Sequence, residues 1–369
     1  MIAVVTSGHK PDDERVYHRE ISSLLNAGYT VHYFTRWDGD SDLSNGNLHH
    51  QNYPRSSTSI KQYIQILNQK IASNHSVLHI HEFDMLPLAK QLKKNHGTKI
   101  IYDVHDTLRA MWDTFSSKKG FMKKVVNRSL SFFETSHLMY VDEVILANRV
   151  MDENYYADKG LSTTVLENFP SRAHISKDKE LSDEPVIIYQ GQISNDRGIS
   201  LLIEAFDQIK EKFPRVKLKL IGTSRTEQFD NILSSMIENS QFSQDIEWIS
   251  EVSYNKVWDY LKDAHIGVIP SLSTPRVIAD TPTKLFEYMA AGCVTVASDV
   301  PPVRHFLEGA GMLVKANDSN ALAESALSML NDNNRFEAYS NESQKRITED
   351  YNWEAIEGKL LDLYKKVTE

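Results

Sequence analysis

The sequence has a single cysteine and no long apolar run. Cys293 is the only cysteine in 369 residues, which excludes an internal disulfide framework and zinc sites built from several thiolates. No stretch approaches the roughly 20 apolar residues of a membrane-spanning helix. The first residues, MIAVVTSGHK, indicate a strand followed by polar sequence, without the apolar segment of a secretory signal. We therefore expect a cytoplasmic protein.

Positive charge is also scarce. The chain has 41 Lys and Arg against 50 Asp and Glu, a formal net charge of −9. Nucleic-acid binding requires positive charge that is clustered over a wide face. The sequence therefore predicts no nucleic-acid partner, and any basic surface must be local.

Strand-like and helical patterns alternate along the chain. The length and the 41% of hydrophobic residues favour two domains, each with a large core. Alternating short β-rich runs and amphipathic helices are typical of parallel sheets covered on both faces. The runs of the first half include IAVVT, YTVHYFTR, SVLHIHE, TKIIYDVHD and DEVILAN, and the pattern begins again with PVIIYQG, VKLKLIG, IEWIS, IGVIP and GMLV. We predict an α/β protein with two successive doubly wound domains.

Two polar segments set the expected boundaries. Residues 171–184 contain almost no large apolar residue and are taken as the linker between domains 1–172 and 185–350. Residues 37–59 are interpreted as a surface loop of the first domain. The C-terminal segment 351–369 has an apolar helical face, which we expect to be buried; it comprises Trp353, Ile356, Leu360, Leu363 and Val367.

Ligands of doubly wound sheets bind beyond the carboxyl ends of the strands. In the second domain the first such loop reads YQGQISNDRGISLL. Gly191 permits a close backbone approach, and Arg197 with the free N–H groups after Gly198 could hold a phosphate. The alternative is that Gly191 serves only a tight turn and Arg197 pairs with a solvent-exposed aspartate.

A second loop leads into the stretch DTPTKLFEYMAAGCVTVASD. A helix is predicted to start near Pro282, since proline is tolerated at that position. Lys284 would add charge to the positive helix end, and Glu287 would accept hydrogen bonds from hydroxyls. A diphosphate joined to a ribose presents that combination of needs. The alternative for Lys284 is a solvated lysine in the first helical turn.

Several motifs in order carry a resemblance that spans nearly the entire chain. They are TSGHKPDDERVYHREISSLLNAGYTV, HIHEFDMLPLA, IYDVHD, VLENFP, YQGQISNDRGISLLIEAF, GVIP and PTKLFEYMAAGCVTVASD. The sequence resembles the retaining glycosyltransferases of the GT-B fold, family four, also called glycosyl transferases group one. The resemblance implies two Rossmann-like domains that face each other across a cleft, with the C-terminal helix packed toward the N-terminal, acceptor-side domain.

The resemblance also implies an activity. It is the transfer of a sugar from a nucleotide-diphosphate sugar to an acceptor hydroxyl, with retained anomeric configuration and without a cofactor or an obligatory metal ion. Two alternatives stay open: a sugar-nucleotide epimerase of the same fold, and a non-catalytic binding subunit. Asp12 to Glu14 could suggest a metal site, but acidic residues are favourable at a helix start, and we expect no metal.

The resemblance assigns roles to individual residues. Glu287 matches the glutamate that holds the donor's ribose, whereas the family's first glutamate falls on Ala279, with Asp280 beside it as a substitute. The family's diphosphate clamp falls on Gln192 and Arg197. The donor-binding residues that we expect are Gly8, Gly191, Gln192, Arg197, Gly198, Thr283, Lys284 and Glu287.

The predicted catalytic residues are His105 and Asp280. His105 follows a strand in DVHD and matches a family histidine near the transferred sugar. The alternative for any single histidine is a hydrogen bond within the core, which is the interpretation that we favour for His79 and His81.

A basic, amphipathic segment spans residues 116–133. It is typical of helices that lie on anionic membranes, and we expect a lipid-linked or polysaccharide acceptor at the inner face of the cell membrane. An ordinary surface helix with solvated lysines is the alternative. The basic residues are Lys118, Lys119, Lys123, Lys124 and Arg128.

Overall fold

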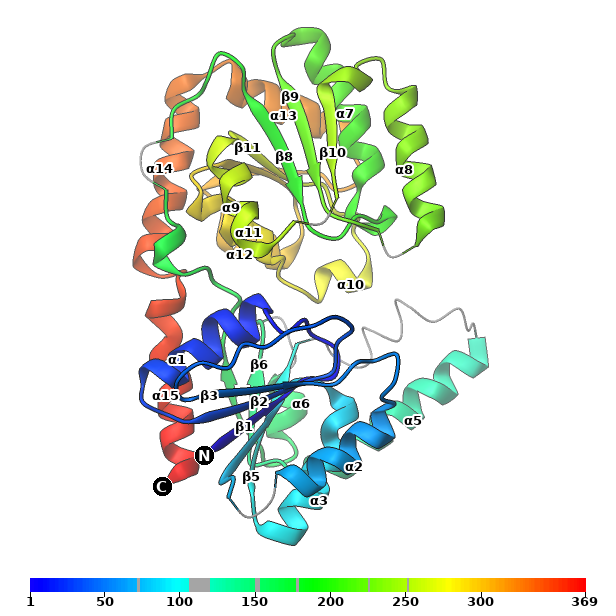
Figure 1. The fold of residues 1–369 in the computed structure, drawn as a ribbon. Coiled ribbons are helices and arrows are strands. Elements are labelled where there is room, and N and C mark those ends of the chain that lie inside the picture. Colours follow the sequence, from blue (N-terminus) through cyan, green and yellow to red (C-terminus); the bar gives the residue numbers. More distant parts are fainter. Residues whose placement is uncertain (72–73, 106–119, 150–152, 177–178, 225, 251) are drawn as a thin grey trace. The chain divides into compact units, whose positions relative to one another are not determined.

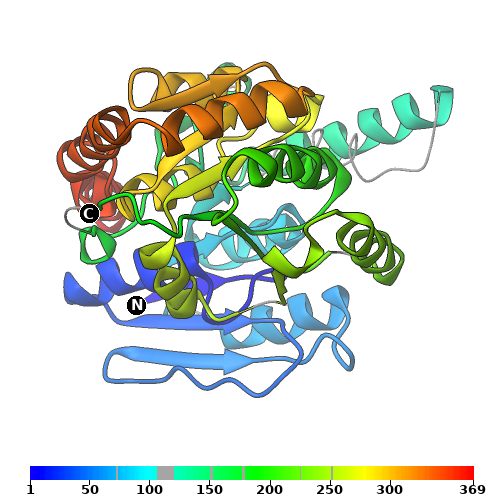
Figure 2. The ribbon, with the colours of Figure 1, turned by 90° about the horizontal axis from the view of Figure 1, so that it is seen from above.

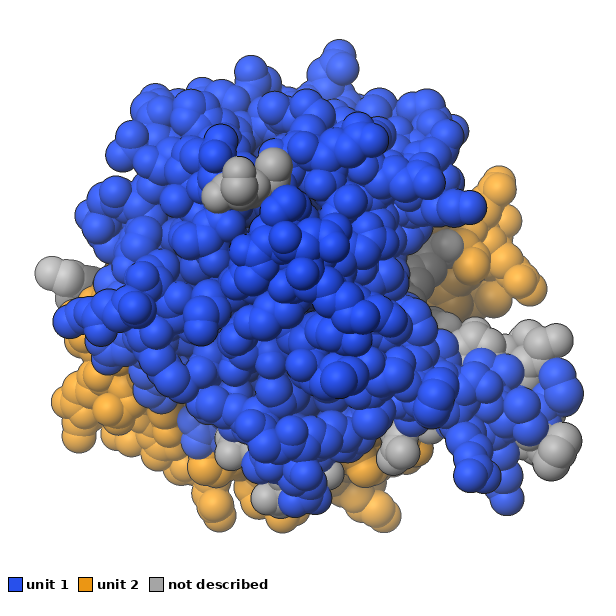
Figure 3. Space-filling model, turned by 90° about the horizontal axis from the view of Figure 1, so that it is seen from below, with its two compact units in different colours: residues 1–168, 356–369 blue, residues 169–355 orange. Residues whose placement is uncertain are grey.

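The computed structural model describes residues 1–71, 74–105, 120–149, 153–176, 179–224, 226–250 and 252–369. Figure 3 shows the two compact units into which the chain divides. Unit 1 comprises residues 1–168 and 356–369, and unit 2 comprises residues 169–355. Each unit is built on a parallel sheet of its own, so each is described by itself.

The sheet of unit 1 has the order β3-β2-β1-β4-β5-β6-β7, and neighbouring strands pair in parallel. The chain runs outward from β1 to β3 and then returns to β4 on the other side of β1. This reversal leaves a ligand-binding position at the carboxyl ends of β1 and β4. The strands are β1 (Ile2–Val5), β2 (Val31–Thr35), β3 (Leu48–Asn52), β4 (Val77–Ile80), β5 (Lys99–Val104), β6 (Glu143–Leu146) and β7 (Ser162–Val165).

Helices cover both faces of this sheet (Figure 1). Leu78 and Ile80 of β4 pack in a core with α2 and α3, whereas His79 points to the other face, because side chains alternate along a strand. There it contacts Tyr364 of α15. The helices that the structure describes in unit 1 are η1 (Glu14–Ile21), which is a π-helix, α1 (Ser22–Asn26), α2 (Ile60–Lys70), the single turn η2 (Phe83–Met85), α3 (Leu86–His96), α5 (Gly120–Leu138), α6 (Glu153–Ala157) and, from Ile356, α15 (Trp353–Thr368).

Unit 2 has the strand order β10-β9-β8-β11-β12-β13, again with parallel pairing and a reversal between β8 and β11. The strands are β8 (Val186–Gln190), β9 (Lys217–Ile221), β10 (Ile246–Ile249), β11 (Ile266–Ile269), β12 (Val294–Ser298) and β13 (Gly311–Val314). Helices α7 and α13 pack against each other over one face (Figure 2). The helices are α7 (Ile199–Lys212), α8 (Glu227–Asn239), α9 (Tyr254–Asp263), α10 (Pro275–Ile278), α11 (Thr283–Ala290), α12 (Pro301–Leu307), α13 (Ser319–Leu330) and α14 (Asn333–Glu349).

The predicted fold class, two successive doubly wound α/β domains, is confirmed. The interpretation of residues 37–59 as a loop is wrong in part, because residues 48–52 form the edge strand β3. Its sequence, LHHQN, buries Leu48 and His50 and exposes His49 and Gln51. Edge strands are often polar, so apolar patterning did not reveal it. Likewise, the loop that was expected before Pro282 contains one helical turn, α10, capped by the Thr274 hydroxyl.

Candidate functional site

Two glycines shape the reversal point of unit 2. Gly191 follows β8 with φ +110°, and a Cβ there would lie 3.1 Å from Nζ of Lys284. Gly198 precedes α7 with φ +73°, and a Cβ there would lie 1.8 Å from the carbonyl oxygen of Pro270. Both positive φ values and both close approaches require glycine. The loop after β8 therefore approaches Lys284 of α11 at Gly191, and it approaches the start of the loop after β11 at Gly198.

Lys284, in the first turn of α11, is buried rather than solvated. Only 8% of the residue is exposed, and its ammonium lies 3.8 Å from the centre of the Tyr189 ring. Burial, followed by the charge of Arg197, lowers the pKa of Lys284 well below its usual value, although Glu287 and Asp280 oppose the shift. Binding of an anion beside Lys284 would stabilise its charged form, which burial and Arg197 disfavour.

Glu287 lies one turn further along α11 and is also buried, at 4% exposure. Its carboxylate accepts a hydrogen bond from Nε2 of Gln190, the last residue of β8. The backbone N–H of Gln190 donates to the Tyr288 hydroxyl at 3.0 Å. The sequence interpretation missed Gln190, although a polar residue that ends the buried strand VIIYQ is a usable signal. These bonds fix α11 to the end of β8.

Arg197 ends the single turn η4 (Asn195–Arg197). Its Nε is buried and has no hydrogen-bond partner among the residues that the structure describes. The neighbouring Asp196 instead accepts a hydrogen bond from Nη1 of Arg276 at 3.1 Å. The described residues therefore do not support the alternative in which Arg197 merely pairs with an aspartate.

The remaining predicted residues of unit 2 lie around the same reversal point. The backbone carbonyl of Gln192 accepts a hydrogen bond from the Tyr189 hydroxyl at 2.6 Å. Thr283 is the first residue of α11, and Asp280 lies half-buried just before it, close enough to act on the charge of Lys284. The structure thus brings the predicted donor-binding residues of unit 2 to one edge of its sheet.

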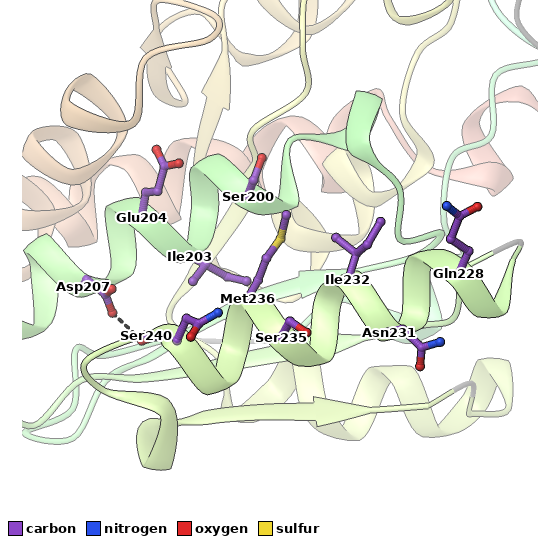
Figure 4. A pocket seen from close by; sticks show the side chains of 11 residues that line it. Ser200, Ile203, Glu204, Asp207, Gln228, Asn231, Ile232, Ser235, Met236 and Ser240 are labelled. Carbon is purple, nitrogen blue, oxygen red and sulfur yellow. Dashed lines mark hydrogen bonds between the residues drawn. The ribbon is translucent and has the colours of Figure 1, made fainter.

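A separate groove of about 670 Å³ lies between α7 and α8 (Figure 4). Its lining includes the apolar side chains of Ile203 and Met236 and the carboxylates of Glu204 and Asp207. Ser240 donates a hydrogen bond to Asp207 at 2.5 Å. Among the residues that the structure describes, no lysine or arginine lines this groove, so the chemistry of its described lining does not suit a diphosphate.

In unit 1 the loop after β1 is held from two sides. The Glu82 carboxylate accepts hydrogen bonds from the backbone N–H groups of Ser7 at 2.9 Å and of Gly8 at 2.6 Å. Arg55 donates to the carbonyl oxygens of the same two residues at 3.2 and 2.6 Å. Gly8 is required here because a Cβ would lie 2.8 Å from Oε1 of Glu82.

Gly8→Ala is expected to destabilise unit 1 by about 1–3 kcal/mol, since the added methyl would displace a carboxylate that two N–H groups hold in place. Gly358→Ala in α15 is the matched control, because its Cβ would meet nothing within 4 Å and alanine favours a helix. Urea denaturation followed by circular dichroism measures both. A Gly8→Ala protein as stable as the control would show that Glu82 does not fix this loop.

His105 lies directly after β5 with its side chain 19% exposed. Its Nε2 is 3.0 Å from Nδ1 of His81 and 3.5 Å from Oδ2 of Asp103, and burial lowers the pKa of His105. The His9 ring lies 4.4 Å away. His105 therefore makes a hydrogen bond within the core, as one interpretation of the sequence had it. Its side chain is also partly accessible, as a contact with a ligand would require.

His9 was missed by the sequence interpretation. Its Nδ1 lies 3.0 Å from Oδ2 of Asp13. Burial lowers the pKa of His9, but the carboxylates of Asp13, Glu82 and Asp103 outweigh burial and raise this pKa to about 9. His9 is therefore a cation at neutral pH, beside His105. The signal in the sequence was its position just after the first strand.

The acidic stretch at residues 12–14 starts a helix, as the sequence suggested. Asp13 caps η1, and its side chain accepts the backbone N–H groups of Arg15 and Val16. Its other oxygen faces His9. Asp13 thus serves as a helix cap and as a partner of His9.

The basic segment is described only in part. Lys118 and Lys119 lie outside the described residues, as does the side chain of Lys123, whereas Lys124 and Arg128 are exposed on α5. The apolar residues Met122, Val125 and Phe132 on the same helix are 52%, 41% and 74% exposed. Apolar side chains on α5 are thus not all turned to the core.

Comparison with known proteins finds a family model that matches much of unit 2. Residues 171–346 match the family model of the glycosyl transferases group 1. This part of the chain is therefore similar to the glycosyl transferases group 1. The match covers most of unit 2, including its predicted donor-binding residues.

Relatives of known name match at low identity. The alpha-maltose-1-phosphate synthase of Mycolicibacterium smegmatis is 27% identical over 243 residues, which are 62% of this chain and 61% of that protein. The phosphatidyl-myo-inositol mannosyltransferase of Mycobacterium leprae is 25% identical over 49% of this chain and 46% of its own. The chain thus spans about half the length of the curated relatives that it matches.

Solved structures share the fold over the whole chain. Sucrose-phosphate synthase from Thermosynechococcus elongatus has a TM-score of 0.78 at 19% identity and covers 100% of this chain and 98% of its own. HepE of Anabaena, in complex with UDP, has a TM-score of 0.76 at 14% identity and covers 99% of each chain. The predicted GT-B class of fold is confirmed by these likenesses.

Proposed function

We propose that the protein transfers a sugar from a nucleotide-diphosphate sugar to an acceptor hydroxyl, with retention of the anomeric configuration. The observation that carries this proposal is the buried pair Lys284 and Glu287 at the start of α11, one turn apart beside Gly191. The lysine suits a diphosphate, and the carboxylate suits the hydroxyls of a ribose. The similar fold of HepE, which was solved with UDP and with UDP-glucose, supports a nucleotide-sugar donor.

The proposed mechanism relies on cations rather than on a metal ion or a cofactor. As the bond between the anomeric carbon and the diphosphate oxygen breaks, negative charge grows on the leaving diphosphate. Lys284, Arg197 and the N-terminus of α11 stabilise that charge. The acceptor oxygen bonds to the same face of the sugar, and its proton passes to the leaving diphosphate. No protein base is required.

The other predicted residues have supporting roles in this proposal. Gly191 and Gly198 let the backbone approach the diphosphate, where Gln192 and Thr283 contribute polar contacts. His105 contacts the transferred sugar, and Asp280 takes the place of the glutamate that the family has at the position of Ala279 in this sequence.

The proposed acceptor is a lipid-linked or polysaccharide precursor, reached at the inner face of the cell membrane. On α5 the exposed Met122, Val125 and Phe132 are spaced by three and seven residues, so they share one helical stripe, with Lys124 and Arg128 exposed beside it. No helix in the described part of the chain has the length and apolarity to cross a bilayer. A relative named phosphatidyl-myo-inositol mannosyltransferase supports a lipid acceptor.

Product analysis tests the proposed reaction against its alternatives. The protein is incubated with candidate nucleotide sugars, with and without an acceptor extract, and free nucleotide and the donor's sugar are followed. Nucleotide release only with acceptor is expected. An altered sugar on an intact nucleotide would indicate the epimerase, and an unchanged donor that nevertheless binds would indicate the non-catalytic subunit.

The membrane contact predicts salt-sensitive sedimentation with anionic liposomes, because each basic residue near such a surface contributes about 1 kcal/mol. A variant in which Lys118, Lys119, Lys123 and Lys124 are changed to Glu is expected to stay in the supernatant at low salt. The matched control changes two exposed lysines of α15, Lys359 and Lys365, to Glu. If wild type and the fourfold variant sediment alike, the acceptor is soluble rather than membrane-borne.

A further inference from the structure

A cluster of two histidines and two carboxylates is buried in unit 1. Glu20 lies on η1, His79 on β4, His81 directly after β4 and Asp103 on β5. One possible ligand atom from each lies within 4.8 Å of all the others, and none of the four residues is more than 2% exposed. The two histidines alternate with Leu78 and Ile80, so they share the sheet face that α15 covers.

Three polar atoms of this cluster converge without a partner. Nε2 of His79, Nε2 of His81 and Oε2 of Glu20 are buried and make no hydrogen bond to any described residue. The two nitrogens lie 4.0 and 3.8 Å from the carboxylate oxygen. These separations exceed a hydrogen bond. Buried polar atoms nearly always have a partner, which is a protein group, a water or an ion.

The opposite nitrogen of each ring is already engaged. Nδ1 of His79 lies 2.7 Å from the Tyr364 hydroxyl. Nδ1 of His81 lies 3.0 Å from Nε2 of His105 and 3.6 Å from Oδ2 of Asp103. Histidines that bind metals hold their second nitrogen in this way, through a carboxylate or another polar group that fixes the ring. The arrangement leaves both Nε2 atoms available to a single ion.

The cluster contains two carboxylates, Glu20 and Asp103, and one arginine, Arg15, lies beside both of them. Arg15 lies with Nη2 3.0 Å from Oδ2 of Asp103 and with Nε 3.0 Å from Oε1 of Glu20. The single positive charge of Arg15 balances Asp103. Glu20 is the second carboxylate of the group, and its Oε2 faces the two imidazoles, where a bound cation would supply a second positive charge.

We propose that Glu20, His79 and His81 bind one Zn²⁺ ion through Oε2 and the two Nε2 atoms, with Tyr364 and Asp103 as positioning residues. Two imidazoles and a carboxylate are a known ligand set for zinc, with a fourth position for water. Bonds of about 2.0–2.1 Å place tetrahedral ligand atoms roughly 3.3 Å apart. The side chains would therefore draw together by about half an ångström.

None of the proposed ligands is a predicted donor-binding residue, and this proposal does not depend on the proposed function. Its residues belong to unit 1, whereas Lys284 and Glu287 belong to unit 2. It departs from the sequence-based expectation of no metal, which concerned the diphosphate and residues 12–14. A zinc ion here would hold η1, β4 and β5 together beneath His105.

Metal analysis of the purified full chain tests the proposal. The protein is treated with a chelator, titrated with zinc chloride in a calorimeter and analysed for bound zinc after gel filtration. One zinc per chain is expected for wild type and for the control His49→Gln, which changes an exposed histidine of β3. Less than a tenth of that amount is expected for Glu20→Gln and for His79→Gln. Wild type without stoichiometric zinc would overturn the proposal and leave water as the partner of the three atoms.

Tyr364→Phe keeps the test decisive if the ligand variants do not fold. Loss of the hydroxyl that holds His79 is expected to weaken zinc binding roughly 10–100-fold. Cobalt loaded in place of zinc should give the visible absorption band of a tetrahedral site. This band should be altered in Tyr364→Phe, whereas it would not change if Tyr364 served only in packing. Unchanged affinity and spectrum in Tyr364→Phe would count against the site.

Discussion

Lys284→Met is expected to lower kcat/KM for the nucleotide-sugar donor by about 10²–10³-fold, the usual cost of removing one preorganised charge from a transition state. Methionine keeps most of the buried volume and its apolar contact with Tyr189, so the fold should persist. The loss should be larger in kcat/KM than in the affinity for the free nucleoside diphosphate, because charge on the diphosphate grows as the bond breaks. UDP serves as the probe because HepE was solved with it.

The measurement combines steady-state kinetics with UDP titration in a calorimeter. Lys256→Met is the matched control, since Lys256 lies in the first turn of α9 and is exposed. It should behave as wild type. Unchanged donor turnover in Lys284→Met would mean that the diphosphate binds elsewhere. We expect Glu287→Ala and Arg197→Ala each to weaken donor binding. If the diphosphate binds elsewhere, these two variants would also bind the donor as wild type does.

His105→Ala is expected to reduce turnover about 10²-fold or more while leaving the affinity for UDP within a factor of a few. The reason is that His105 is assigned to the transferred sugar, whereas UDP lacks that sugar, and a lost polar contact to a reacting group has this magnitude. His105→Gln should recover part of the rate if a hydrogen bond to the sugar is the main contribution.

His96→Ala, an exposed histidine at the end of α3, is the control for this comparison. Circular dichroism must show that His105→Ala is folded, since the change also removes the partner of His81. Equal losses in turnover and UDP affinity, or no loss in either, would remove His105 from the list of catalytic residues.

Much of the architecture could be predicted because apolar periodicity is local. The runs IAVVT and PVIIYQG each form the first strand of a unit. The glycines at 191 and 198 and the proline at 282 marked the loops, because their backbone preferences act without tertiary context. The family motifs then placed Lys284 and Glu287 at one helix start, where the structure has them.

Polar residues in buried positions were harder to predict. β3 was missed because LHHQN lacks an apolar run, and Gln190 because its partner, Glu287, lies 97 residues away. The same holds for Asp103, whose partners Arg15 and His81 lie on η1 and directly after β4, and for the contact of His9 with the His105 ring. Contacts of this kind depend on which strands are adjacent, and no local pattern contains that information.

The sequence by itself determined the two doubly wound units, the loops at their carboxyl ends and the family resemblance, since each depends on residues close together in the chain. Only the tertiary structure decided that Lys284 is buried over Tyr189 instead of solvated. It also decided that His79 and His81 face Glu20 beneath His105. The physical reason is that burial and pairing of charges arise when strands and helices distant in sequence pack together, and those contacts set what a side chain can bind.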